Sequence, residues 1–297
     1  MEKAKITFLG TSSAVPTKKR SHTAILLNYK NESILVDCGE GTQRQFRLAN
    51  LSPAKLTKII ITHWHGDHTL GLPGLFQTLS TIGYSKTLEI YGPKGTNRYI
   101  SLLHDMFKVE IKLEVHEVSG KFLETEDFFL EAFPMKHGPP SLAYSFVIKD
   151  RRKLFKDKLK KFNLPNSPIL KQLQQGKSIK YKEKTISPNQ VSKIEKGKKI
   201  TIILDTLPNP NTEKIAKNSD LLICEASFSK NEAQKANKYR HLTSIDAASI
   251  AKKAKAKKLI LTHLSERYEK NPKIIENEAK KIFTQVSLAK DFDSVEV

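Results

Sequence analysis

Residues 61–70 read ITHWHGDHTL and place four potential metal ligands within six positions: His63, His65, Asp67 and His68. A single histidine beside an apolar run is more often a packed or exposed side chain, but this density favours a metal site because imidazole and carboxylate groups bind zinc and similar ions well. One tetrahedral ion cannot easily take all four from so short a loop. Two adjacent ions can, and such pairs lie about 3.5–4 Å apart. The stretch therefore predicts a two-metal site.

Composition limits the class of protein. The chain has 297 residues, 38% of them hydrophobic, which is enough for one large core or two small ones. It contains no run of about 18 apolar residues, and its first residues lack the pattern of a signal peptide. Cys38 and Cys224 do not make a disulfide framework. We expect a soluble, cytoplasmic protein without a membrane segment.

The positive charge is concentrated in one part of the chain. The net charge is +20, and residues 151–184 hold twelve basic and two acidic residues, which is half of the excess. A uniformly lysine-rich surface would not produce this distribution, so it favours a polyanionic partner, with nucleic acid first. The basic insert (residues 150–184) is too polar for a central core element and is expected to form a projecting arm.

The rest of the chain alternates between strand-like and helix-like segments, which indicates an α/β protein. Strands are expected at 3–9, 23–29, 33–37, 58–62 and 87–93 and within 111–147, with helices at 71–83 and 95–107. KIIITH (58–63) recurs as KLILTH (258–263), and SILVDCG (33–39) resembles TIILDTL (201–207). Two echoes in the same order suggest two related halves. We therefore expect one domain over residues 1–297 that carries the basic insert.

Two ions need more ligands than the histidine loop supplies. His137, Asp205 and His263 each follow a strand-like segment, where a rigid sheet can direct a side chain. A carboxylate at Asp205 is suited to bridge both ions. We assign the first ion to His63, His65, His137 and Asp205, and the second to Asp67, His68, His263 and again Asp205.

Several motifs resemble those of ribonuclease Z, in the metallo-β-lactamase superfamily. They are LGTSSAVPTKKRSHTA, VDCGEGTQRQ, THWHGDHTLGLPGL, LDT, CEASF, HLTS and THLSERY, and the resemblance spans roughly residues 3–270. It implies an αββα sandwich and a metal-dependent endoribonuclease that removes the 3′ trailer from precursor tRNA. It also implies two Zn²⁺ ions per subunit. The length is similar to the short form of the family, a homodimer in which each arm reaches the tRNA held by the other subunit.

The expected mechanism follows from the residues and the resemblance together. Hydroxide made available at the two ions attacks the phosphodiester, and Asp67 orients or deprotonates the attacking water. His241 is suited to protonate the leaving ribose oxygen, with Glu225 holding its imidazole, and the family uses this pair in that role. Basic side chains are expected to contact RNA phosphates. These are Lys18, Arg20, Arg151, Arg152, Lys153, Lys158, Lys160 and Lys161.

The sequence departs from the family pattern at three places. Ser21 stands where the family has Asn, LPNSP (164–168) replaces a Gly-Pro turn at the arm tip, and Ile203-Leu204 replaces Ser-Gly before Asp205. The first two put individual tRNA contacts and the rejection of CCA ends in doubt. Two alternatives remain open from the residues alone, a two-zinc hydrolase of small phosphodiesters or other esters and a non-catalytic RNA-binding relative. Mn²⁺ or Fe²⁺ could occupy similar ligands.

Overall fold

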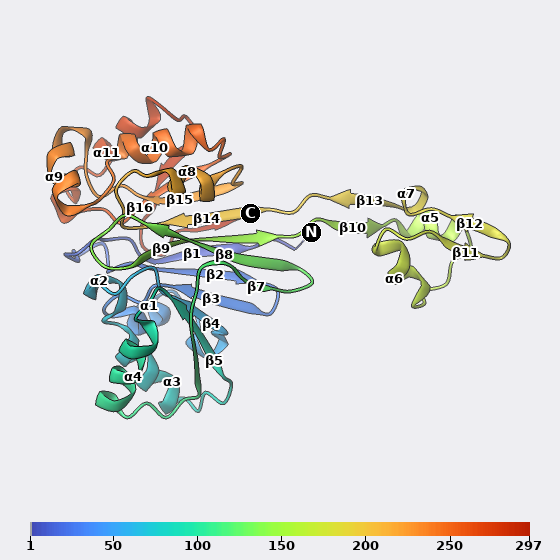
Figure 1. Cartoon of the computed structure of the whole chain (residues 1–297), viewed down its shortest axis with the longest axis horizontal. Helices are drawn as coiled ribbons and strands as arrows, with labels where there is room; N and C mark the ends of the chain where they lie inside the picture. The colour runs from blue at the N-terminus through green and yellow to red at the C-terminus, as the bar shows by residue number, and fades with distance from the viewer. Residues whose placement is uncertain (1) are drawn as a thin grey trace. The chain divides into compact units, whose positions relative to one another are not determined.

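A computed structural model describes residues 2–297, which divide into two compact units (Figure 1). The main unit consists of residues 2–123, 130–146 and 199–297, and the small unit of residues 124–129 and 147–198. Each unit has its own apolar core.

Two seven-stranded sheets dominate the described residues. The first has the order β18-β1-β2-β3-β4-β5-β6 and the second β17-β16-β15-β14-β9-β8-β7. The strands of the first are β1 Lys5–Gly10, β2 Ala24–Tyr29, β3 Glu32–Val36, β4 Lys58–Ile60, β5 Leu88–Gly92, β6 Leu113–Glu117 and β18 Ser294–Glu296. Those of the second are β7 Gly120–Glu124, β8 Phe128–Met135, β9 Ser141–Ile148, β14 Lys199–Ile203, β15 Leu221–Glu225, β16 Leu259–Thr262 and β17 Val286–Leu288.

Helices cover the outer face of each sheet in the main unit (Figure 1). On the first sheet they are α1 Thr42–Leu48, α3 Leu72–Thr81 and α4 Thr96–Phe107, with the short α2 Gly66–Thr69 before α3. On the second they are α8 Pro210–Ala216, α10 Ser244–Lys253 and α11 Lys273–Lys280, with α9 Ala233–Tyr239 before α10. The predicted αββα sandwich is confirmed.

Each sheet contains a run of neighbouring parallel strands. Strands β3 to β6 run parallel in the first sheet, and β14 to β17 run parallel in the second. Both groups contain strands that are buried along their whole length, such as KII in β4 and LILT in β16. Continuous apolar runs are typical of parallel strands covered on both faces. Their carboxyl ends share one edge of each sheet, which is where such folds place their sites.

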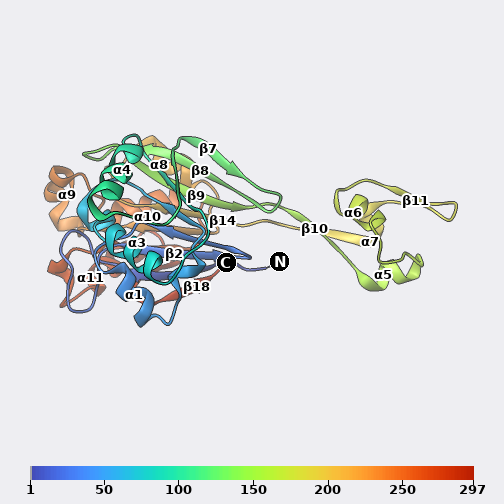
Figure 2. The ribbon, with the colours of Figure 1, turned by 90° about the horizontal axis from the view of Figure 1, so that it is seen from below.

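The small unit contains the predicted basic insert and continues to Lys198. Its strands are β10 Arg151–Leu154 paired with β13 Ser192–Glu195, and the hairpin of β11 Ile179–Tyr181 with β12 Lys184–Ile186. Its helices are α5 Lys156–Lys161, α6 Ile169–Gln174 and α7 Pro188–Val191 (Figure 2). Leu164, Leu173, Ile179, Ile186 and Val191 form its core. Apolar residues spaced among the lysines therefore build a small packed structure.

The expected strands and helices before residue 110 are found, each with its ends shifted by a few residues. The region 111–147 contains β6 to β9, as expected. Among residues 2–297, none of the helices combines the length and apolar character that crossing a membrane requires.

A close backbone contact fixes the loop that follows β3. Gly71 N donates to Cys38 O at 2.9 Å, and Cys38 N donates to His68 O at 2.7 Å. A Cβ atom at Gly71 would lie 2.0 Å from the carbonyl oxygen of Gly39. Only glycine fits this approach, so Gly71 keeps the loop after β3 next to α2 and its histidine.

We expect Gly71→Ala to lower the free energy of unfolding by about 1–3 kcal/mol, because the added methyl group forces two backbone segments apart. Urea unfolding followed by circular dichroism measures the change. Thr81→Ala is the control, because Thr81 is exposed at the end of α3, the helix that begins directly after Gly71. It should change stability by less than about 0.5 kcal/mol. Equal stability of Gly71→Ala and the wild type would show that the contact is not tight.

Candidate active site

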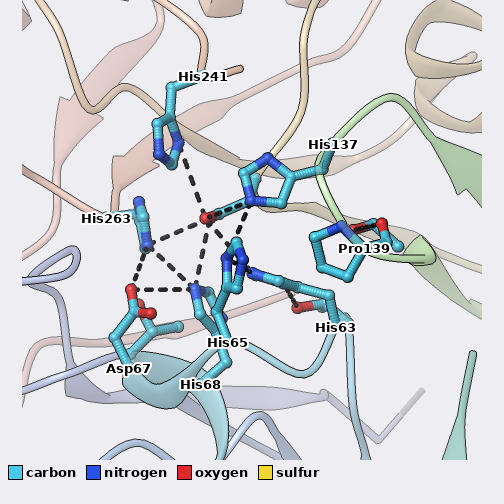
Figure 3. Close-up of polar contacts among 12 residues, drawn as sticks. His63, His65, Asp67, His68, His137, Pro139, His241 and His263 are labelled. Carbon is cyan, nitrogen blue, oxygen red and sulfur yellow. Dashed lines mark hydrogen bonds and ion pairs between the residues drawn. The ribbon is translucent and has the colours of Figure 1, made fainter. Parts of the chain in front are cut away.

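Most of the site residues lie at the carboxyl ends of parallel strands from both sheets, whereas His137 follows β8 and His241 lies between α9 and α10. The first sheet supplies the loop after β4 and helix α2, and the second supplies the ends of β14, β15 and β16. The side chains brought together are His63, His65, Asp67, His68, His137, Asp205, Glu225, His241 and His263. Most of them converge on one centre in Figure 3. All seven predicted metal ligands are among them.

The first group of donors surrounds His65. Its Nδ1 lies 3.1 Å from His63 Nε2 and 3.1 Å from His137 Nε2. Asp205 Oδ2 lies 3.5 Å from His63 Nε2 and 3.6 Å from His137 Nε2. The four atoms therefore face a common point, and they belong to the residues assigned to the first ion.

The second group uses the other oxygen of the same aspartate. His68 Nε2 and His263 Nε2 are 3.1 Å apart, and Asp67 Oδ2 lies 3.3 Å from each. Asp205 Oδ1 is 3.4 Å from His68 Nε2 and 3.1 Å from His263 Nε2. Asp205 thus gives one oxygen to each group, as a bridging carboxylate would.

The donor atoms fit divalent cations. Four donors at the usual zinc–nitrogen distance of 2.0–2.1 Å stand about 3.3 Å from one another on a tetrahedron. The distances given above run from 3.1 to 3.6 Å, and all donor atoms of each group lie within 4.8 Å of one another. Within residues 2–297, Asp205 Oδ1 is buried and accepts no hydrogen bond, although His263 Nε2 lies 3.1 Å away. A buried carboxylate oxygen without a hydrogen-bond donor is costly, and a bound cation would compensate it.

The protonation states also suit a cation. Burial lowers the pKa of His63, His65 and His137, which favours neutral imidazole. Burial also opposes the charged form of His68, but the carboxylates around it outweigh burial and raise its pKa, so a cation that binds there displaces a proton. Burial alone would raise the pKa of Asp67 and Asp205, but the neighbouring histidines outweigh it and lower both values. Neutral imidazoles and ionised carboxylates are the forms that bind metal.

Each ligand histidine except His65 is held through its other ring nitrogen. Nδ1 of His68 lies 2.6 Å from Asp37 Oδ2, and Nδ1 of His263 lies 2.8 Å from Ser227 Oγ. The remaining two contacts are His137 Nδ1 with Arg240 O at 3.0 Å and His63 Nδ1 with Thr62 Oγ1 at 3.1 Å. Such contacts fix the tautomer and the ring orientation of metal ligands.

Sequence reasoning assigned no role to Asp37. Its carboxylate is buried, and it also accepts hydrogen bonds from the backbone and hydroxyl of Thr62 at 2.7 and 2.6 Å. Its φ of 57° lies in the left-handed region, which is uncommon for a residue other than glycine. The echo of SILVDCG with TIILDTL carried the signal, because it aligns Asp37 with Asp205.

Glu225 and His241 form a pair beside the two groups. His241 Nδ1 lies 3.1 Å from Glu225 Oε2, and Glu225 is fully buried. The carboxylate is held by Thr206 N at 2.8 Å and Ser227 Oγ at 2.7 Å. Burial opposes the charged form of His241, but Glu225 and Asp205 outweigh it and raise the pKa of His241 to about 9. His241 is therefore equipped to hold a proton.

The predicted RNA-contact residues occupy different settings. Lys18 is exposed in the main unit. Arg20 is only 6% exposed, and its Nη1 donates to Thr11 Oγ1 and to Ala289 O, both at 2.7 Å. We correct the expectation for Arg20, because a guanidinium buried in this way braces the loop and does not face RNA. The other six lie in the small unit: Arg151, Arg152, Lys153, Lys158, Lys160 and Lys161.

Solved structures with the same fold define the class. The metallo-β-lactamase fold protein YhfI from Bacillus subtilis superposes with a TM-score of 0.73 over 100% of both chains at 21% identity. Human tRNase Z, short form, superposes with a TM-score of 0.71 over 98% of both chains at 28% identity. The fold and the donor groups together define a metal-dependent hydrolase of the metallo-β-lactamase fold.

Sequence relatives narrow the class. Ribonuclease Z of Methanothermobacter thermautotrophicus is 40% identical over 98% of this chain and 96% of its own length. Ribonuclease Z of Pediococcus pentosaceus is 37% identical over 98% of each. The chain belongs to the ribonuclease Z family.

The model of a further family, described as Anti-Pycsar protein Apyc1, matches residues 4–172, which include the histidine loop and His137 but end before Asp205.

We expect Asp37→Ala to weaken metal binding about 10- to 100-fold, because His68 loses the carboxylate that orients its ring. Competition with a chelator, followed by elemental analysis of the protein, measures the affinity. Cys38→Ala is a matched control, since Cys38 is the next residue and is also fully buried, with a free thiol. Equal metal retention by Asp37→Ala and Cys38→Ala would contradict the role of Asp37.

Proposed function

We propose that this chain is an endoribonuclease that removes the 3′ trailer from precursor tRNA with two Zn²⁺ ions per subunit. The observation that carries the proposal is the placement of the Glu225–His241 pair directly beside two donor groups that share Asp205. Membership of the ribonuclease Z family and the basic small unit support the choice of substrate. With precursor tRNA as substrate, we expect the enzyme to act in the cytoplasm.

The seven donor residues would hold the ions, and Asp205 would bridge them. Bound divalent cations neutralise phosphodiester charge and make hydroxide available near neutral pH. Asp67 lies at the edge of the second donor group with its side chain partly accessible. Its carboxylate can orient the attacking water and accept a proton from it.

His241 has the contacts of a general acid. Its Nδ1 is directed at Glu225, so that Nε2 is left to donate a proton to the leaving ribose oxygen. Glu225 cannot move freely, because Thr206 and Ser227 hold both of its oxygens. The pair thereby keeps one tautomer and one ring orientation.

Two substitutions should separate the roles of these residues. We expect Asp67→Ala to abolish cleavage with tRNA affinity largely kept. We expect His241→Ala to slow cleavage about 100- to 10,000-fold, as loss of a general acid does, with metal content unchanged. Single-turnover cleavage of a precursor tRNA, tRNA binding and elemental analysis are the measurements.

His116→Ala serves as the control, because the side chain of His116 is 37% exposed on β6, the strand at the edge of the first sheet, and belongs to neither donor group. It should cleave like the wild type. Loss of metal from His241→Ala would contradict its role as an acid and make it a ligand.

The small unit offers a surface suited to RNA. Arg151, Arg152, Lys153 and Lys160 line a cavity of about 780 Å³ with Leu154 and Leu159 among its apolar residues. Arg152 is held in place by Asn189 and Ser192, at 2.8 and 3.1 Å. Basic side chains contact phosphates with little sequence preference, which suits a folded RNA recognised by its shape. A hydrolase of small esters would have no use for this surface.

We further propose a homodimer. Large apolar side chains are exposed on and beside the helices of the first sheet, at Leu48, Leu70, Ile82, Tyr99, Leu102, Met106 and Phe107. Helix α3 packs against both α1 and α4, so these side chains belong to one helical layer. Clustered exposed apolar residues commonly mark protein–protein contacts. In the dimer each small unit would serve the tRNA held by the partner.

Removal of the small unit should affect binding and spare the chemistry. Asp150 and Lys196 are paired at 2.8 Å, so residues 151–195 can be replaced by a short Gly-Ser link. We expect KM for precursor tRNA to rise about tenfold or more, with hydrolysis of bis(p-nitrophenyl) phosphate nearly unchanged. The dependence of affinity on salt should also become shallower, because fewer phosphates are neutralised.

Mixed dimers test the arrangement across subunits. Subunits without the small unit, combined with Asp67→Ala subunits, should regain tRNA cleavage that neither variant has alone. If the deletion damaged small-phosphodiester and tRNA cleavage equally, the small unit would be part of the catalytic fold and the proposed tRNA contact would fail.

A further inference from the structure

A hollow of about 320 Å³ lies next to His241 in the main unit. Leu207, Pro208 and Ala233 contribute apolar surface, and Asn237, Asp246 and His241 contribute polar groups. The hollow is formed by the segment after β14, by α9 and by the first turn of α10. Since His241 lines it, whatever occupies the hollow lies beside the proposed proton donor.

The polar groups of the hollow are free to bind a ligand. Asp246 uses Oδ2 to accept hydrogen bonds from the backbone and hydroxyl of Thr243, at 3.0 and 2.6 Å. Within residues 2–297, Asp246 Oδ1 and the exposed amide of Asn237 have no hydrogen-bond partner. Asn237 and Asp246, which line the hollow, thus have polar atoms available to a ligand.

The charges around the hollow disfavour a phosphate as its occupant. Of the residues that line it, His241 alone can carry a positive charge, and Glu225 already faces that imidazole, while the carboxylate of Asp246 repels an anion. A flat heterocycle with hydrogen-bond donors on its edge fits such a surface, because apolar walls contact its faces and the polar groups read its edge. The chemistry therefore points to a nucleobase.

The position next to His241 indicates which nucleotide of the RNA would supply this base. His241 lines the hollow, and its Nδ1 faces Glu225 and lies 3.7 Å from Oδ2 of the shared donor Asp205. If His241 protonates the leaving ribose oxygen, the base on that same ribose lies nearest the hollow. We propose that this hollow binds the base of the nucleotide immediately before the cleaved bond and that Asn237 and Asp246 recognise it. This inference rests on the proposed function.

The donors and acceptors favour adenine over uracil. A free carboxylate oxygen accepts a hydrogen bond from an exocyclic amino group, which adenine has and uracil lacks. The amide of Asn237 can pair with the amino group and adjacent ring nitrogen of adenine in a bidentate manner. Recognition of the base would then act together with the contacts of the small unit, which are insensitive to sequence.

The test uses precursor tRNAs that differ only in the unpaired nucleotide before the cleavage site. We expect the wild type to cleave the adenine substrate with a higher kcat/KM than the uracil substrate. Asn237→Ala should lower kcat/KM for adenine about threefold to tenfold, the effect of losing one or two hydrogen bonds, and should change the uracil value little. Gln234→Ala, exposed on the same helix but outside the hollow, should keep the wild-type ratio.

A second variant fills the hollow and leaves the polar groups in place. Ala233 is exposed, so Ala233→Trp is expected to fold, and its melting temperature and metal content verify this. It should reduce the preference for adenine as Asn237→Ala does. An adenine-to-uracil ratio that stays at the wild-type value in both Asn237→Ala and Ala233→Trp would overturn the proposal.

Equilibrium binding distinguishes this failure from failure of the proposed function. The same tRNAs, trimmed to end at the nucleotide in question, are titrated against the wild type and Asn237→Ala. A wild-type preference for adenine that Asn237→Ala abolishes supports the hollow even if no trailer is released from any substrate, a result that would refute the proposed function alone. Equal binding of adenine, uracil and abasic ends by the wild type would overturn the hollow, whatever the cleavage results.

Discussion

The shared carboxylate of Asp205 is the group on which the geometry of the site depends. It follows β14 of the second sheet, is 3% exposed, and faces His63 and His68 from the first. A buried carboxylate costs several kcal/mol unless opposite charge compensates it. Because the groups around Asp205 come from both sheets, the two sheets must keep one position relative to each other. The hydrogen bond from Tyr144 Oη to Ile61 O, at 2.8 Å, helps to join them near this point.

Strained backbone accompanies this arrangement. Asp37 and His263 have φ values of 57° and 58°, and both follow a buried parallel strand. Such conformations cost on the order of 1–3 kcal/mol each and persist where surrounding contacts impose them. Here they direct one side chain to the cation site and another to a ligand histidine. The fold therefore gives up some stability in order to aim these groups.

The concentrated basic residues and the proposed catalytic residues lie in different parts of the chain. The small unit holds most of the concentrated basic residues and none of the donor groups, while the hollow beside His241 is lined by a carboxylate and by neither lysine nor arginine. Phosphate binding supplies affinity without sequence information. Base recognition, by our inference, is confined to a few polar atoms close to the cleaved bond.

The sequence by itself determined the order of strands and helices up to residue 147, the seven candidate ligands and the basic insert, because each is a local pattern of residues. Only the tertiary structure decided that Asp37 holds His68, that Arg20 is buried, and that Asn237 and Asp246 share a hollow. These facts depend on distances between residues far apart in the chain. His68 and His263 are separated by 195 positions, yet their ring nitrogens lie 3.1 Å apart. Local periodicity carries no information about such a distance, whereas the packing of two sheets fixes it.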